Sequence, residues 1–122
     1  MFSYEFYKNL HLLGIFMLFL SLGGLVAHRI NGGERATPWR KPIALTHGFG
    51  MTISLIAGFG MIARLQISWP YPGWIWLKVA IWLFFGGSIA LAYRLPWTLR
   101  PLWFTLVALG GIAAYLALYK PF

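Results

Sequence analysis

The sequence predicts an all-α integral membrane protein, built as an antiparallel up-and-down bundle of four transmembrane helices. Only 10% of the 122 residues are charged, whereas 60% are hydrophobic and 19% are aromatic. So short a chain cannot bury that much apolar surface in a core surrounded by water. The apolar residues also fall into four runs. Each run is close to the ~20 residues that a helix needs to cross ~30 Å of hydrocarbon.

The four runs occupy about residues 6–28, 43–66, 74–93 and 101–119. Turn-forming residues separate them, namely Asn31-Gly32-Gly33, Trp69-Pro70-Tyr71-Pro72-Gly73, and Pro96 with Pro101. Backbone amides inside lipid must be bonded within their own segment, so runs of this length are helices. Because the connections are short, neighbouring helices run antiparallel, and residues 1–122 are expected to form one membrane domain.

The charge of the chain is strongly positive, with ten Lys and Arg, two acids and a net charge of +8. The cations stand singly at the ends of the apolar runs, where they meet lipid phosphates. Nucleic-acid binding would need a basic cluster among polar residues, so the expected partner is the bilayer. The first and third loops hold six cations against four on the opposite side. This asymmetry predicts that both termini lie outside, and we expect a bacterial inner membrane as the location.

The first apolar run is expected to stay in the mature protein. Glu5 precedes it, and the run from Leu10 to Ala27 is longer than the apolar region of a signal peptide. No small-x-small cleavage site stands before His28.

Small residues predict where the helices pack. In the second run His47, Gly50, Ser54 and Gly58 share one stripe of a 3.6-residue helix. Gly110 and Ala114 repeat the four-residue spacing in the fourth run. Small residues at this spacing let helix backbones approach closely in lipid, so both stripes are interpreted as packing faces.

Two ionisable residues inside the apolar runs are the first candidates for a site. His11 lies about five residues into the first helix and Lys78 about four into the third, which puts both roughly 6–8 Å below the same face. Each has a simple interpretation, because an interfacial His can bond a backbone carbonyl or water and a Lys can extend to the interface. Together they can instead form a polar pocket for an anionic group, such as a porphyrin propionate, or supply an axial nitrogen to haem.

His47 is the third candidate cofactor-binding residue, because Gly48 and Gly50 leave open space around it. It enters the membrane from the face opposite to His11, so these two residues are not expected to ligate one iron. If haem b is bound, either His11 or His47 is the expected ligand. His28 matches His47 better in depth, but it precedes Arg29 at a helix end, where a His commonly faces headgroups.

Short motifs mark the first three predicted helices, namely Tyr7-Lys8-Asn9-Leu10-His11, His47-Gly48-Phe49-Gly50, Gly58-Phe59-Gly60 and Trp74-Ile75-Trp76-Leu77-Lys78. In these motifs, and across essentially the whole chain, the sequence resembles the small four-helix SirB, CopD and HemJ-like membrane proteins. The resemblance implies a shared fold. That group includes a haem-containing protoporphyrinogen oxidase and copper-resistance proteins, and its recurring His in the first helix and Lys after a Trp match His11 and Lys78. The oxidase type carries Pro-Arg after the first helix, where this chain has no proline, so the resemblance does not extend to the oxidase motif.

Catalytic residues are not expected. The chain has no Cys, no acid inside the apolar runs, no Ser-His-Asp set and no His cluster at metal spacing. Our leading hypothesis is therefore a non-catalytic accessory subunit that packs against a larger membrane complex or against itself. The alternative is a b-type haem or porphyrin-binding membrane protein with a possible redox role.

Overall fold

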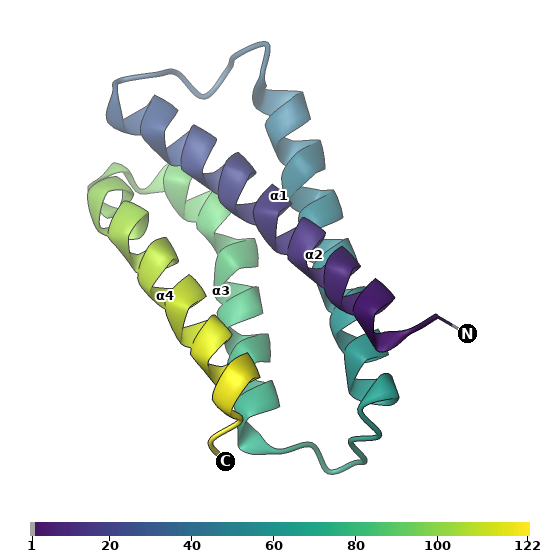
Figure 1. Ribbon diagram of the computed structural model, residues 1–122. Coiled ribbons are helices and arrows are strands. Elements are labelled where there is room, and N and C mark those ends of the chain that lie inside the picture. The colour runs from purple at the N-terminus through teal and green to yellow at the C-terminus, as the bar shows by residue number, and fades with distance from the viewer. Residues whose placement is uncertain (1) are drawn as a thin grey trace.

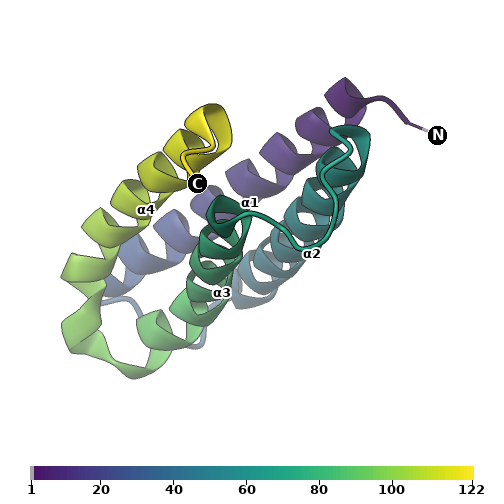
Figure 2. The ribbon, with the colours of Figure 1, turned by 90° about the horizontal axis from the view of Figure 1, so that it is seen from below.

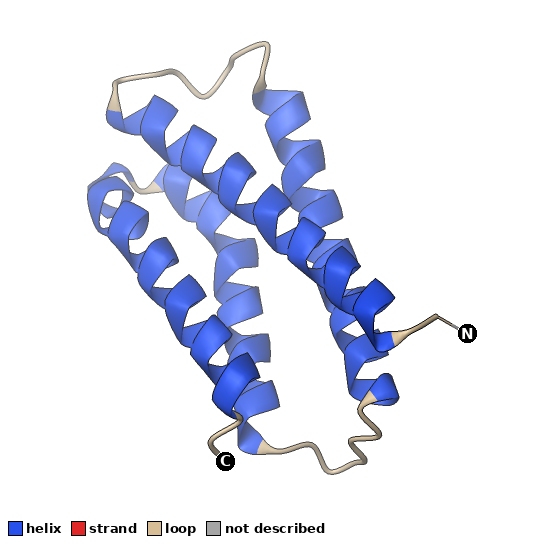
Figure 3. Cartoon of the chain, in the orientation of Figure 1, coloured by secondary structure: helices blue, strands red, loops and turns tan. Residues whose placement is uncertain are grey.

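The computed structural model describes residues 2–122, which form helices joined by short loops. The helices are α1 (Tyr4–Ile30), α2 (Arg40–Arg64), α3 (Gly73–Arg94) and α4 (Leu99–Tyr119), with a short 3-10 helix η1 (Pro96–Thr98) before α4. Figure 3 shows helices and loops, and no strand, in this described part of the chain. Successive helices run in opposite directions (Figure 1), so the predicted antiparallel bundle is confirmed.

The helices begin and end within a few residues of the predicted bounds, and local chemistry explains the differences. α1 begins at Tyr4 because the side chain of Ser3 accepts a hydrogen bond from the Phe6 amide at 3.1 Å, as an N-cap does. α2 already begins at Arg40, with Pro42 in its first turn. Proline is tolerated there because the first amides of a helix have no partner inside it.

Four helical segments are long and apolar enough to cross a bilayer, the last of them running from Pro96 to Tyr119. The protein is therefore a small integral membrane protein with four spans. Large apolar side chains stand on the outside of the bundle, where lipid is their solvent: Phe16 is 65% exposed, and Leu20 and Phe104 are each 73% exposed.

Helix α1 is the centre of the bundle. It packs against α2, α3 and α4, whereas α2 meets α3 only sparsely. Figure 2, which views the molecule from below, shows α4 on one side of α1 and α2 on the other. The two neighbours of α1 are held in different ways.

The contact between α1 and α2 is made by backbone atoms, where Gly14 faces Gly50 and Ser54. A Cβ atom on Gly14 would lie 2.7 Å from the amide nitrogen of Ser54, and one on Gly50 would lie 2.9 Å from the carbonyl oxygen of Gly14. A larger residue at either position would force the helices apart. We call these three residues the glycine seam, and they confirm that Gly50 and Ser54 belong to a packing face.

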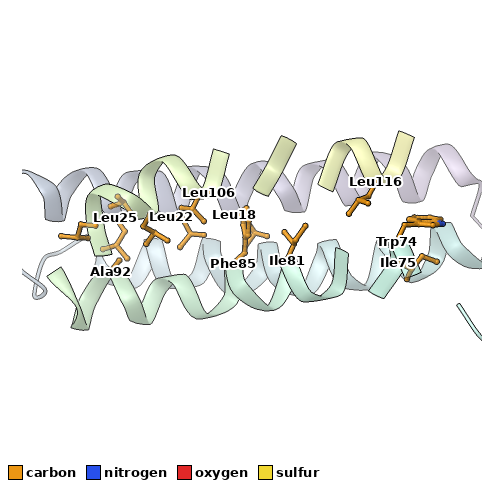
Figure 4. Packing of buried hydrophobic residues seen from close by; sticks show 13 residues of the cluster. Leu18, Leu22, Leu25, Trp74, Ile75, Ile81, Phe85, Ala92, Leu106 and Leu116 are labelled. Carbon is orange, nitrogen blue, oxygen red and sulfur yellow. The ribbon is translucent and has the colours of Figure 1, made fainter. Parts of the chain in front are cut away.

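On its other side α1 makes side-chain contacts. Figure 4 shows one apolar cluster to which α1, α3 and α4 each contribute, including Leu18, Leu22, Leu25, Phe85, Ala92 and Leu106. Leu22 is 1% exposed and Ala92 is fully buried. The ring of Phe19 lies 2.6 Å from where a Cβ of Gly110 would be, so Gly110 of the predicted small-residue face packs closely, whereas Ala114 of that face is exposed.

Arg29 closes the end of the bundle that carries the loop of residues 31–39. Its Nε donates to the carbonyl of Ala92 at 3.2 Å, and its Nη1 donates to the carbonyl of Gly33 at 2.8 Å. One guanidinium thereby joins the end of α1 to the end of α3 and to the loop, and it satisfies carbonyls that a helix end leaves unpaired.

Candidate functional site

His11 lies in the second turn of α1 and is held by α2. Its Nδ1 is 2.8 Å from the carbonyl oxygen of Ser54. A carbonyl can only accept, so Nδ1 carries the proton and Nε2 of the neutral ring keeps a lone pair. The ring lies against Gly58 of α2, where a Cβ would be 3.4 Å from it, at ordinary van der Waals distance.

Lys78 approaches the same place from α3. Its side chain is half-buried, and its ammonium makes no hydrogen bond and no ion pair with residues 2–122. Lys78 and His11 line one cavity, so the structure brings together the two residues that the sequence placed at one depth. Their role as ligand-binding residues stays a prediction.

This cavity, which we call the His11–Lys78 cavity, has a volume of about 170 Å³ and is walled by α1, α2, α3 and the end of α4. Most of the wall is apolar, from residues such as Leu55, Val79 and Trp82. The charged residues that line it are all cations, namely Lys8, Lys78 and Lys120, and neither acid of the chain lines it.

Two further bonds hold the wall in place. The indole Nε1 of Trp82 donates to the carbonyl of Met51 at 3.0 Å, which fixes α3 against α2 beside the cavity. At the mouth, the ammonium of Lys120 lies 5.6 Å from the centre of the Trp74 ring and donates to the carbonyl of Ala117 at 2.7 Å. The sequence did not indicate Lys8, Lys120 or Trp82 as residues of this cavity, because spacing along one helix does not tell which side chains of different helices line a common space.

His47 lies elsewhere. It is 7% exposed, its Nε2 is 3.1 Å from the carbonyl oxygen of Phe85 in α3, and it does not line the His11–Lys78 cavity. Along α2 it stands seven residues before Ser54, about 10 Å of helix. As the depth argument predicted, His11 and His47 do not face a common site.

His28 bonds to the loop instead of facing another helix. Its Nε2 is 2.9 Å from the carbonyl oxygen of Glu34, and its ring fills the space beside Gly33. This bond secures the loop at the end of the bundle opposite to His11. Within residues 2–122 no three His, Cys, Asp or Glu side chains gather as a metal site would require.

Haem can be tested against this geometry. The nitrogen donors suit it, because a ligating His commonly donates its other ring N–H to a carbonyl, as His11 does to Ser54. The volume of the cavity does not suit haem. The cavity holds about 170 Å³, and sites for drug-sized ligands span ~300–1,000 Å³. A porphyrin ring therefore does not fit inside the cavity.

Comparison of the chain with protein families, with curated proteins and with solved structures gives no match. The likeness to the SirB, CopD and HemJ-like proteins thus stays a prediction from short motifs, and the site is interpreted from its own geometry.

Proposed function

We propose that this membrane protein is a non-catalytic binding protein that holds an anionic amphiphile in the His11–Lys78 cavity. The carrying observation is the ammonium of Lys78, which is half-buried and has no hydrogen bond or ion pair within residues 2–122. An unpaired cation inside a membrane protein is costly. A carboxylate or phosphate oxygen placed beside it would supply the missing acceptor and a countercharge.

The walls of the cavity indicate the rest of the ligand. Leu55, Val79 and Trp82 offer apolar surface next to the ammonium, and no acid competes for it. The volume of about 170 Å³ holds the head and the first few methylene groups of one slender chain, so the rest of a long chain would lie in the lipid. A single-chain amphiphile, such as a long-chain carboxylate, has an anionic head for the ammonium and an apolar chain for the wall beside it.

His11 adds a second polar contact. With its proton on Nδ1, which is bonded to Ser54, the Nε2 lone pair can accept from a hydroxyl group of the ligand. Lys8 and Lys120, which lie near the two ends of the chain, also line the cavity. Their charges attract the anionic end of a ligand from the side of the bilayer on which the two chain ends lie.

The test compares two probes that differ only in their head: 9,10-dibromostearate and 9,10-dibromostearyl alcohol. Bromine quenches tryptophan, and Trp82 and Trp74 line the cavity. In nanodiscs of neutral lipid, we expect the carboxylate to bind ~10-fold more tightly, as a charge-assisted hydrogen bond implies. Lys78→Met should abolish this preference, and Trp82→Phe should reduce the quenching.

The matched control is Lys41→Met, which removes an exposed lysine at the opposite end of the bundle. It should keep the preference for the carboxylate. Equal affinity of the two probes for the unaltered protein, or an unchanged preference in Lys78→Met, would refute the proposed ligand class.

The haem hypothesis is separated from this one by an absorption spectrum. After expression with ample haem, we expect the purified protein to show no Soret band, because the cavity lacks room for a porphyrin. If the purified protein shows a Soret band and His11→Ala abolishes it, the ligand of the cavity is haem and not an amphiphile.

A second candidate function, an accessory subunit, is favoured by glycines on the outside of the bundle. Gly87 of α3 and Gly111 of α4 are exposed, and a Cβ on either would meet nothing within 4 Å. Such positions let a helix of another protein approach closely. The chain has no Cys, so Gly87→Cys and Gly111→Cys can report a neighbour in native membranes. We expect a defined cross-linked product from these sites and none from Ile56→Cys, at a position of α2 that is 64% exposed. Monomer from all three variants would count against a partner.

A further inference from the structure

A second cavity, which we call the loop-one cavity, lies at the end of the bundle opposite to the His11–Lys78 cavity. It has a volume of about 470 Å³ and is enclosed by the end of α1, the loop of residues 31–39, the start of α2 and Tyr93 of α3. This volume falls within the ~300–1,000 Å³ of ligand sites. Nothing in the function proposed above uses it.

The mouth of this cavity is cationic. Arg35 and Arg40 line it, and the one acid that does so, Glu34, leaves a net charge of +1 for the three side chains. The side chain of Arg40 is held in place: its guanidinium carbon lies 4.3 Å from the centre of the Tyr93 ring, and its Nη1 donates to the carbonyl of Arg35 at 3.3 Å. Because a guanidinium has five N–H groups, most of its donors are left for a ligand.

The start of α2 strengthens the positive field. Its first turn holds Arg40 and Lys41 and no acid. The N-terminus of a helix is itself positive, so cations there are unfavourable and an anion is favoured. Arg35 adds a guanidinium that makes no hydrogen bond or ion pair through its own side chain within residues 2–122. An anion at the mouth would be attracted by all three cations and would offset part of their charge.

The inner wall is apolar and continues onto the lipid-facing surface. Leu20 and Gly24 line the cavity, and Leu20 is 73% exposed. A Cβ on Gly24 would meet nothing within 4 Å, so the cavity is open along α1 beside this glycine, and we call this open stretch the channel. The remaining apolar wall comes from Leu25 and Ile43. A chain of methylene groups could lie here with its other face in the bilayer.

The mouth of the loop-one cavity lies at the level of the lipid headgroups. Trp39 lines the mouth and is 66% exposed, and Trp97 at the same end of the bundle is 75% exposed. Tryptophans gather at the level of the headgroups in membrane proteins. Basic pockets between transmembrane helices at this level are suited to anionic lipids. A soluble anion would account for the arginines but not for the channel beside Gly24.

We propose that the loop-one cavity binds one anionic glycerophospholipid, with the phosphodiester at Arg35 and Arg40 and one acyl chain along Leu20, Gly24 and Ile43. The bond of His28 to the carbonyl of Glu34, 2.9 Å long, holds the loop over the headgroup. This site is independent of the amphiphile site at the other end of the bundle.

The experiment measures retained lipid by native mass spectrometry. The full chain is released from nanodiscs that contain equal amounts of phosphatidylglycerol and phosphatidylcholine. We expect one phosphatidylglycerol to be retained, with a preference over phosphatidylcholine of ~10-fold, as charge-assisted hydrogen bonds imply. Equal retention of the two lipids would overturn the proposal.

Two pairs of variants locate the site. Arg35→Gln with Arg40→Gln should abolish the preference, whereas Arg94→Gln with Arg100→Gln, two exposed arginines of the same end that do not line the cavity, should keep it. Gly24→Phe should fill the channel and lower retention. Gly23→Phe is its control, because Gly23 also has nothing within 4 Å and does not line the cavity.

Two more arms complete the test. Glu34→Gln removes the only acid at the mouth and should raise retention of phosphatidylglycerol. Glycerol 3-phosphate, which has the phosphate and no chain, should not displace the lipid at equal concentration. If it does, or if Gly24→Phe and Gly23→Phe bind equally well, the site recognises a soluble phosphate and the lipid assignment is wrong.

Discussion

His11 and His47 make nearly the same bond in different surroundings. Each ring is bonded to a backbone carbonyl of a neighbouring helix, His11 to Ser54 at 2.8 Å and His47 to Phe85 at 3.1 Å. His47 is buried among packed helices, while His11 lines a cavity that it shares with Lys78. The hydrogen bond alone therefore does not distinguish a structural histidine from one that can meet a ligand. The space beside the ring and the unpaired ammonium across it make the difference.

The bond between His11 and Ser54 requires α1 and α2 to pack closely, and the glycine seam allows this close packing. Gly14→Leu should have the largest effect on stability of any single substitution proposed for this chain, because its side chain would meet the Ser54 amide nitrogen, 2.7 Å from the Cβ position. We expect a loss of about 3 kcal/mol or more in the free energy of unfolding. Reversible unfolding in mixed micelles, followed by circular dichroism, measures it.

Gly23→Leu is the matched control on the same helix, because a Cβ there has no neighbour within 4 Å. It should unfold at nearly the same denaturant concentration as the unaltered protein. If Gly14→Leu behaves like Gly23→Leu, then α1 and α2 do not touch at the seam.

The two histidines should differ next in stability. His47→Ala removes a bond between α2 and α3, which otherwise meet only sparsely, and opens a space in a packed interior. We expect it to cost ~1–2 kcal/mol of unfolding free energy. His11→Ala should cost less, because a cavity already lies beside that ring. Equal losses from the two substitutions would mean that His11 is packed as His47 is.

Much of the fold and part of the candidate site could be predicted from the sequence. The fold followed from the length of four apolar runs, and the shared level of His11 and Lys78 followed from counting residues along helices of fixed rise. Gly50 and Ser54 were found by their spacing. Gly14, their partner in α1, has no such repeat beside it, so its role becomes visible only when the two backbones meet.

Other features of the site could not be predicted from the sequence. The acceptors of both histidines are backbone carbonyls, and a carbonyl belongs to every residue type. Lys8 and Lys120 come from the two ends of the chain, and only the packing of the helices makes both of them line one cavity. Which helix lies at the centre of a bundle depends on the fit of all four, and periodicity describes each helix alone.

The smallest expected effect on stability is that of Lys78→Met. Its ammonium bonds to nothing within residues 2–122, and methionine keeps most of the apolar stem while removing the unpaired charge, so the unfolding free energy without ligand should not fall and should rise by up to ~0.5 kcal/mol. With a saturating carboxylate probe the unaltered protein should be the more stable of the two, since it is stabilised by binding.

The double variant His11→Ala with Lys78→Met sharpens this result. If both residues contact one ligand, their effects on probe affinity should be non-additive, whereas independent sites add within ~0.5 kcal/mol. Strict additivity, with small single effects, would make both of them ordinary interfacial residues.

The most direct test of the account is nitrogen NMR of the histidine rings. The chain has three histidines, so three pairs of ring signals are expected, and single substitutions assign them. On addition of the carboxylate probe, we expect the Nε2 signal of His11 to shift, because this atom is the free acceptor beside the cavity, while His28 and His47 keep theirs. An unmoved His11 signal at saturating probe, or an equal shift of His47, would contradict the assignment of ligand binding to the His11–Lys78 cavity.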